Sequence, residues 1–252
     1  MPTAAASSES ERPRVGRPAR INRQMIAVAA HDLGLDGLTL RAVADHLGVS
    51  IAALYHHVSS KDDLMRAAAE YSATKVPLPA DRGQHWALWL LEWAVYSREA
   101  FLAQPGLLAQ YLEGAISAEA IAGNIDAVLR LLVSQDFTLL EANAAYELVT
   151  ATALGSAVGV IREQEAESAG RSLKAVHEDV LAAHGPDELQ HLRRLIEELH
   201  RAGRRSFHQQ ITTVLCGIAT ERGLAWAPIA ALLDEARPTR SRSPEPHPRP
   251  AP

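Results

Sequence analysis

Residues 39–61 contain two short apolar patterns separated by one glycine, and this spacing narrows the possible folds more than any other feature of the chain. The first pattern follows one helix face, at Leu40, Val43, Ala44 and Leu47. Gly48 can adopt the positive φ that ends a helix, and Ser50 is a favoured N-cap for the next one. The segment therefore predicts two helices joined by a turn of about three residues, which is the spacing of a helix-turn-helix unit.

The second of these helices exposes a face that suits DNA. Its N-terminal part is small and its C-terminal part carries hydrogen-bond donors. The exposed residues are Ser50, Ile51, Ala52, Ala53, Tyr55, His56 and His57. Small side chains let a helix enter a major groove while polar flanks rest on phosphates, so this face predicts a DNA-reading helix. The alternative is an ordinary corner between two helices of any helical protein.

The flanking segments weigh against that alternative. Residues 21–33 predict an amphipathic helix that ends at Gly34, and the turn after it delivers Thr39 as the next N-cap. Ser60 and Asp63 have the spacing of a capping box and open a fourth helix. Three helices and a connecting fourth predict a complete helix-turn-helix DNA-binding domain over residues 21–75.

Residues 21–70 resemble the DNA-binding domain of the tetracycline-repressor (TetR) family of transcriptional regulators. The resemblance rests on a pattern spread over all three helices and the start of the fourth: Ile26, Ala29, Ala30, Leu33, Gly34, Gly37, Leu38, Thr39, Arg41, Val43, Ala44, Leu47, Gly48, Val49, Ser50, Leu54, Tyr55, His57, Val58, Lys61 and Leu64. It implies an all-α protein with an N-terminal three-helix DNA-binding domain and a larger C-terminal helical domain that binds a ligand and dimerises. The resemblance is far weaker beyond residue 75.

The resemblance also implies roles for individual residues. The expected phosphate contacts are Thr39, Tyr55, His57 and Lys61, and Arg41 is expected to reach a base. The chain departs from the founding branch of the family at residues 51–53, Ile-Ala-Ala, where polar base-reading side chains are expected. Apolar side chains can contact thymine methyls but cannot form bidentate hydrogen bonds with a base. Arg41, His56 and groove shape are therefore expected to supply much of the discrimination.

The net charge of −5 is unevenly distributed along the chain. Residues 1–30 carry five Arg and two Glu, a net charge of +3, and residues 237–252 carry four Arg and one Glu, again +3. Residues 31–236 therefore carry −11, so the acidic balance lies mostly away from the DNA-facing end. Residues 1–20 predict a basic arm that places Arg17 in the minor groove, or else a solubilising disordered tail. Residues 237–252 predict a disordered tail.

Composition agrees with a cytoplasmic regulator. The chain has 252 residues, 47% of them hydrophobic, which is enough for one small and one larger domain. The single cysteine, Cys216, excludes a disulfide framework and a thiolate metal cluster and favours a reducing cytoplasm. No stretch approaches about 18 consecutive apolar residues, so no membrane partner is expected. No cofactor and no metal are expected either, because His177, His184 and His191 lie seven apart across a Gly-Pro break.

Residues 83–236 predict a second, larger helical domain. Its sequence has helical spacing, few strand residues, and caps or Gly-Pro pairs that divide it. The predicted helices cover residues 84–104, 107–114, 118–134, 138 to beyond 161, 172–184, 186–221 and 225–236.

Two of these helices have faces that suit a homodimer. The helix from residue 138 carries small residues every four positions, at Ala151, Gly155 and Gly159. The helix from residue 186 carries a bundle-like seam that includes Leu192, Ile196, Leu199, Gly203 and Phe207. Both faces could instead be internal core. The resemblance favours the interface, and two reading helices held roughly 35 Å apart can read successive major grooves of a palindrome.

Aromatic residues are concentrated on the helix from residue 84. With the later aromatic and polar residues they predict an apolar effector cavity with a few polar groups, lined by Trp86, Trp89, Trp93, Tyr96, Tyr111, Asn143, Tyr146 and Glu147. His85 and Arg98 are further candidates for polar contacts. The alternative is core packing against the DNA-binding domain.

Together these features predict a homodimeric, ligand-responsive repressor that leaves a palindromic double-stranded DNA operator when a small, largely apolar effector binds. An activator, or a regulator that needs no effector, is the alternative within DNA-binding proteins. An all-α ligand carrier or enzyme is a more distant alternative. Against an enzyme, the sequence has no Gly-rich phosphate loop, no nucleophile and base in a supporting context, and no metal-ligand spacing.

Overall fold

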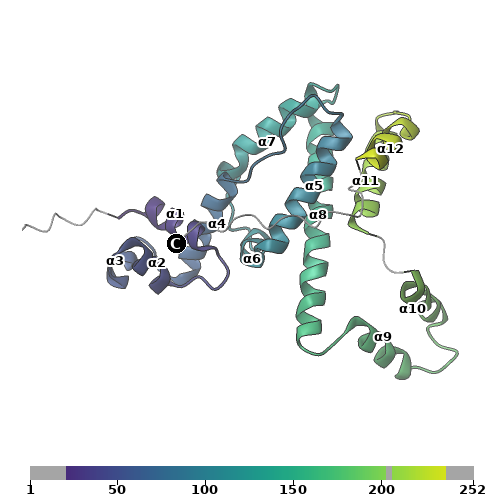
Figure 1. Ribbon diagram of the computed structural model, residues 1–252, viewed down its shortest axis with the longest axis horizontal. Coiled ribbons are helices and arrows are strands. Elements are labelled where there is room, and N and C mark those ends of the chain that lie inside the picture. Colours follow the sequence, from purple (N-terminus) through teal and green to yellow (C-terminus); the bar gives the residue numbers. More distant parts are fainter. Residues whose placement is uncertain (1–20, 203–205, 237–252) are drawn as a thin grey trace, which may run out of the picture.

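The computed structural model describes residues 21–202 and 206–236, and these residues form twelve α-helices and no strand (Figure 1). The predicted arm at 1–20 and tail at 237–252 lie outside the described residues. The helices are α1 Arg23–Leu33, α2 Leu40–Leu47, α3 Ile51–Tyr55, α4 Lys61–Thr74, α5 Trp86–Ala103, α6 Pro105–Leu112, α7 Ala118–Val133, α8 Leu139–Ser168, α9 Leu173–Ala182, α10 Gln190–Ala202, α11 Phe207–Glu221 and α12 Trp226–Glu235.

Short polar side chains begin the N-terminal helices. The side-chain oxygens of Asn22, Thr39, Ser50 and Ser60 each accept the backbone N–H of the residue three positions later, which satisfies one unpaired amide of the first turn. Gly48 ends α2 with φ 65°, a left-handed conformation that side chains disfavour. The turn between α2 and α3 is therefore the short one that the sequence predicts.

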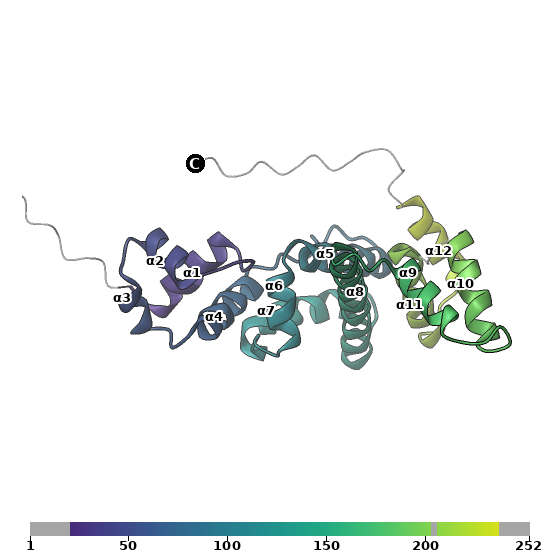
Figure 2. The ribbon, with the colours of Figure 1, turned by 90° about the horizontal axis from the view of Figure 1, so that it is seen from below.

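Helices α1–α4 surround one small core. Its fully buried members come from α1, the α1–α2 loop, α2, α3 and α4, and include Ile26, Leu35, Val43, Leu54 and Leu64. Helix α1 packs along α4, while α2 and α3 lie at the end of the molecule farthest from α8–α12 (Figures 1 and 2). The arrangement leaves α3 projecting away from the larger domain.

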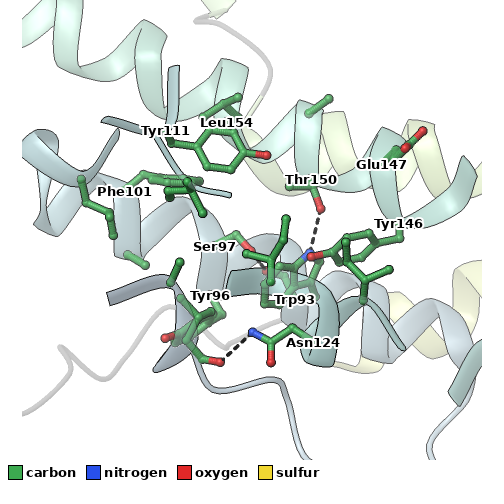
Figure 3. Close-up of a pocket in the computed structure, with 18 of the residues that line it drawn as sticks. Trp93, Tyr96, Ser97, Phe101, Tyr111, Asn124, Tyr146, Glu147, Thr150 and Leu154 are labelled. Atoms are coloured by element: carbon green, nitrogen blue, oxygen red, sulfur yellow. Dashed lines mark hydrogen bonds between the residues drawn. The ribbon is translucent and has the colours of Figure 1, made fainter. Parts of the chain in front are cut away.

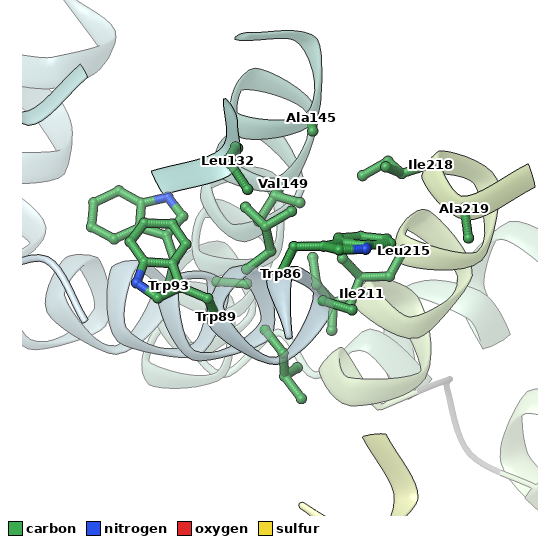
Figure 4. Close-up of a cluster of buried hydrophobic side chains, with 14 of the residues drawn as sticks. Trp86, Trp89, Trp93, Leu132, Ala145, Val149, Ile211, Leu215, Ile218 and Ala219 are labelled. Atoms are coloured by element: carbon green, nitrogen blue, oxygen red, sulfur yellow. The ribbon is translucent and has the colours of Figure 1, made fainter. Parts of the chain in front are cut away.

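The larger domain is built on α5 and α8, which pack against each other, with α11 closing the same core. Residues from α5, α7, α8 and α11 meet in it, including Trp86, Trp89, Leu132, Val149, Ile211 and Leu215 (Figure 4). Helix α8 begins at a reciprocal capping box, because the Thr138 hydroxyl accepts the Glu141 N–H while the Glu141 carboxylate accepts the Thr138 N–H.

The prediction of one helix over residues 186–221 is wrong. The structure has two helices there, α10 and α11, and Ser206 starts the second with a capping box to Gln209. Helices α9 and α10 form an arm that extends away from α11 and α12 (Figure 1). The Arg193 guanidinium of α10 donates to the carbonyls of Leu181 and Gly185, which holds the two helices of the arm together.

Among the described residues, one helix, α8, is long and apolar enough to cross a membrane when only length and composition are considered. One such helix is weak evidence, since core helices of soluble proteins have the same composition. Helix α8 packs against α5, α7 and α11.

Candidate DNA-binding face and effector cavity

The predicted DNA-contacting residues within the described chain come from α2, α3, the turn after α3 and the first residue of α4. Thr39 caps α2 and Arg41 lies in its first turn; Ser50 caps α3, and residues 51–55 form it. His56 and His57 follow α3, and Lys61 begins α4. Arg17 lies outside the described residues.

Most of the predicted DNA-contacting side chains are exposed, including apolar and aromatic ones. Tyr55 is 53% exposed and Ile51 39%, while Ala53 and His57 are half-buried. The Arg41 side chain is 82% exposed and lies 3.8 Å from the Asp45 carboxylate. Such an exposed ion pair contributes little, so Arg41 can exchange Asp45 for another partner at low cost.

Thr39 and Ser50 use their hydroxyl oxygens as caps. The Thr39 oxygen accepts the Ala42 N–H at 3.1 Å and the Ser50 oxygen accepts the Ala53 N–H at 3.2 Å. A hydroxyl that accepts one hydrogen bond can still donate its own hydrogen. Both groups can therefore donate to a phosphate without losing their capping role.

Arg23 fixes the turn that follows α3, a role that the sequence does not predict because the partners lie 34 and 40 residues away. Its guanidinium donates to the His57 carbonyl at 3.1 Å and to both oxygens of Asp63. Asp63 also accepts the Ser59 N–H at 2.8 Å. The hydrogen bond from Arg23, followed by that from the Ser59 amide, holds the pKa of Asp63 far below its ordinary value.

A cavity of about 320 Å³ lies between α4, α5, α6, α7 and α8 (Figure 3). It is lined by Ala73, Val76, Trp93, Tyr96, Ser97, Ala100, Phe101, Leu107, Tyr111, Ile116, Ile121, Asn124, Ile125, Asn143, Tyr146, Glu147, Thr150, Ala151 and Leu154. Six of the eight predicted ligand-binding residues are in this set. Leu107 of α6 and the lining residues of α7 were not predicted, because nothing in the sequence of those helices marks which face turns inward.

Trp86 and Trp89 are not among the lining residues, although the sequence predicted them there. Trp86 packs edge-on against Phe137 with ring centroids 5.4 Å apart, and Trp89 donates its indole N–H to the Pro79 carbonyl at 2.9 Å (Figure 4). Both side chains belong to the core of the larger domain. The physical reason is position along α5: Trp86 and Trp89 lie near its start, beside Phe137 and Pro79, and only residues from Trp93 onward reach the cavity.

His85 and Arg98 also lie outside the lining. His85 caps α5, where its Nδ1 accepts the Ala87 N–H at 3.2 Å, and burial followed by the charge of Arg222 lowers its pKa. The Arg98 guanidinium donates to the Ser156 hydroxyl at 3.0 Å and stands 5.1 Å from the Phe207 ring centroid.

Hydrogen bonds inside the cavity fix several polar groups. The Trp93 indole N–H donates to the Thr150 hydroxyl at 2.9 Å, and the Asn124 amide nitrogen donates to the Val76 carbonyl at 3.3 Å (Figure 3). Burial raises the pKa of Tyr146 to about 12, so its phenol stays protonated at neutral pH. No group of three or more His, Cys, Asp or Glu side chains that could hold a metal ion occurs in the part of the chain that the structure describes.

Helix α6 connects this cavity with the N-terminal domain. Leu107 lines the cavity and, at 7% exposure, also belongs to the core formed with α1–α4. The N–H of Gly106 donates to the Asp36 carboxylate in the α1–α2 loop at 2.8 Å. Gln104, which precedes α6, makes no side-chain cap, so Asp36 caps this helix from the other domain.

The outer face of α8 carries a continuous exposed apolar stripe, which we call the α8 stripe: Leu140, Ala144, Leu148, Ala151, Gly155 and Gly159. Helix α11 lies beside it and exposes Gln210, Thr213 and Gly217. On α10, Leu192 and Leu199 are half-buried and Ile196 is 4% exposed; Phe207 begins α11. Gly203 lies outside the described residues.

Residues 29–68 match the family model described as "Bacterial regulatory proteins, tetR family". The chain is 31% identical over 154 residues to tetracycline repressor protein class D of Escherichia coli, covering 58% of this chain and 68% of that protein. It is 30% identical over 205 residues to the class A tetracycline repressor protein from transposon 1721 of Escherichia coli, covering 76% and 86%. The chain belongs to the TetR family.

A solved TetR-family structure shares the fold. The Streptomyces coelicolor protein ActR, solved in complex with actinorhodin, aligns with a TM-score of 0.57 at 18% identity over 81% of this chain and 100% of that one. The all-α prediction is thereby confirmed for the described residues. As a TetR-family member the chain is a helix-turn-helix, DNA-binding transcriptional regulator, and its curated relatives are regulators and not enzymes.

Proposed function

We propose that this TetR-family protein is a cytoplasmic, homodimeric repressor that binds a palindromic operator and leaves it when a small, largely apolar effector enters the cavity between α4 and α8. One observation carries the proposal: Leu107 belongs both to the cavity wall and to the core of the DNA-binding domain. That DNA binding represses transcription, and does not activate it, is inferred from the relatives named tetracycline repressors.

On the DNA side, we assign base reading to a few exposed groups. Arg41 and His56 are proposed to contact base edges, and the small apolar residues 51–53 to meet thymine methyls. Thr39, Ser50, Tyr55, His57 and Lys61 are assigned to phosphates. The exposure of most of these side chains and the free hydroxyl hydrogens of the two capping residues support this division.

The dimer is proposed to form across the α8 stripe together with α11. The stripe exposes Leu140 at 84% and Leu148 at 49%, and such contiguous apolar surface marks an association site. Its small residues, Ala151, Gly155 and Gly159, allow close approach of a second helix. Residues 192, 196 and 199 stay predictions, because α10 belongs to the arm. Phe207 also stays a prediction; it begins α11, and its ring centroid lies 5.1 Å from the Arg98 guanidinium.

We propose that the effector controls DNA binding because it binds one arrangement of the DNA-binding domain more tightly than another. An effector that contacts Tyr111 on α6 changes the position of Leu107, and through it the placement of α1–α4, only if it binds one arrangement more tightly than the other. Coupling of this kind commonly amounts to about 1–3 kcal/mol, or roughly a 5- to 150-fold change in DNA affinity. Helix α4 gives a second connection, because Ala73 near its end and Val76 just after it line the cavity.

A gel-shift titration on the DNA that flanks the coding region of this protein tests the proposal, with and without candidate apolar compounds. We expect one specific complex that dissociates when an effector is added. An effector that tightens the complex would indicate an activator or co-repressor system. A specific complex that no cavity ligand affects would indicate an effector-independent regulator.

A further inference from the structure

The cavity between α4 and α8 has no buried charge on its wall. Of the nineteen described residues that line it, Glu147 is the one with a side chain that is charged at neutral pH. Glu147 is exposed, and its carboxylate points away from the rings of Trp93 and Tyr146 (Figure 3). The interior therefore offers an ionic partner to neither a cationic nor an anionic ligand.

This absence of charge selects against ionised ligands. A charge that leaves water for an apolar site without a partner costs several kcal/mol, even after the surroundings relax. An anion would in addition meet the field of the Glu147 carboxylate at the rim. A cation would gain only the faces of aromatic rings, which contribute about 0.5–2 kcal/mol.

Two groups of aromatic rings form opposite parts of the wall. Trp93 and Tyr146 stack with centroids 5.6 Å apart and planes 29° from parallel. Phe101 and Tyr111 pair at 5.5 Å on the other side of Ser97 (Figure 3). Flat faces separated in this way suit a planar ring system. The volume of about 320 Å³ lies near the lower end of the roughly 300–1,000 Å³ of ligand pockets, which limits the occupant to a compact one.

One polar group is positioned to orient such a ring. The amide nitrogen of Asn124 is held by the Val76 carbonyl, so its Oδ1 is left to accept a hydrogen bond from a ligand. Burial keeps the Tyr146 phenol neutral, so this lining residue adds no charge to the wall. An O–H or N–H donor on the ring edge would satisfy Asn124.

We propose that the effector is a compact planar aromatic molecule that is uncharged when bound and donates a hydrogen bond to Asn124. The inference rests on the proposed function only in calling the bound molecule an effector. Which kind of ligand the cavity binds is a property of the cavity alone, and it is measured without DNA.

Calorimetric titration of the full chain with three matched naphthalenes tests the charge class. The probes are 2-naphthol, which is uncharged at pH 7, 2-naphthoate, an anion, and 2-naphthylmethylammonium, a cation. We expect 2-naphthol to bind at least tenfold more tightly than either ion. Equal or tighter binding of an ion, or no binding of 2-naphthol, would overturn the proposal.

Two pairs of variants locate the binding. Asn124→Leu should lower the affinity for 2-naphthol to that for naphthalene. Gln164→Leu also replaces a side-chain amide by leucine, but at an exposed α8 position outside the lining, and it should leave the affinity unchanged. Ala100→Phe fills the cavity and should abolish binding, whereas Ala103→Phe on the exposed end of α5 should not. Circular dichroism checks that each variant folds. Unchanged binding in both Asn124→Leu and Ala100→Phe would refute the assignment to this cavity.

A DNA-binding titration separates the two proposals. If 2-naphthol binds with the expected selectivity and DNA affinity does not change, the class of ligand stands and the regulatory function fails. If DNA affinity responds to an ionised compound that binds in this cavity, the function stands and the class of ligand fails.

Discussion

Substitution of Gly106 by alanine is the sharpest test of the contact between α6 and the DNA-binding domain. A Cβ added at Gly106 would lie 3.0 Å from the Asp36 carboxylate, 3.2 Å from the Leu35 Cβ and 3.3 Å from the Leu35 carbonyl carbon. The Asp36 side chain can rotate away, but the Leu35 backbone cannot. The α1–α2 loop must therefore move relative to α6.

The sign of the effect follows from two opposing magnitudes. Alanine is favoured over glycine in a helix interior by about 1 kcal/mol, and by less in a first turn. Displacement of the loop weakens the hydrogen bond from the Gly106 N–H to the Asp36 carboxylate, and hydrogen bonds to charged groups contribute about 1.5–3 kcal/mol. The loss exceeds the gain, so Gly106→Ala should lower the free energy of unfolding by about 1 kcal/mol.

Gly123→Ala is the matched control. Gly123 lies within α7, and an added Cβ would have no atom within 4 Å other than those of its chain neighbours and the backbone of its own helix. This variant should raise the free energy of unfolding by about 0.5–1 kcal/mol. Urea titrations of both variants, with the slope m compared to detect a changed unfolded state, measure the difference. If Gly106→Ala were as stabilising as Gly123→Ala, the reasoning about the α6 contact would be refuted.

Further predictions concern the DNA-binding face, the Arg23 contact and the dimer. Arg41→Ala should reduce discrimination between operator and mutated operator, whereas Tyr55→Phe should weaken binding to all DNA sequences alike. An equal loss of discrimination in both variants, measured by anisotropy titrations at fixed salt concentration, would contradict these roles. Because its pKa is lowered, Asp63 stabilises the fold above the unfolded value of about 3.9, and this contribution is lost as the pH falls below it. In urea titrations, the loss in free energy of unfolding caused by Asp63→Asn should therefore stay constant from pH 7 to about pH 5 and shrink below about pH 4. A loss that disappears already between pH 7 and pH 5 would contradict this explanation. Leu148→Glu should sediment as a monomer and Leu33→Glu, an exposed leucine of α1, as a dimer; the α8 stripe is not the interface if both remain dimeric.

Helix caps and glycine breaks, which are read directly from the sequence, predicted most of the helices. Caps such as Ser50, Ser60 and Thr138, and breaks such as Gly48, act within three or four residues, so the sequence places them directly. The break before α11 escaped prediction because the apolar seam continues through it with helical spacing. Ser206 and Gln209 form a capping box there, and periodicity alone does not register such a cap.

The site was less predictable, since tertiary packing decides it. Trp86 and Trp93 lie seven residues apart on one helix, yet one meets Phe137 in the core and the other meets Thr150 in the cavity. Asn124 and Asp36 gain their roles from partners 48 and 70 residues away. Spacing along the chain carries no information about such partners.

An anisotropy titration of labelled DNA from beside the coding region, combined with sedimentation of the complex, tests the central claim most directly. The account predicts two chains per site and a preference over random duplex of at least about 10³-fold, as specific DNA-binding proteins show. A monomer that binds every duplex equally would contradict it.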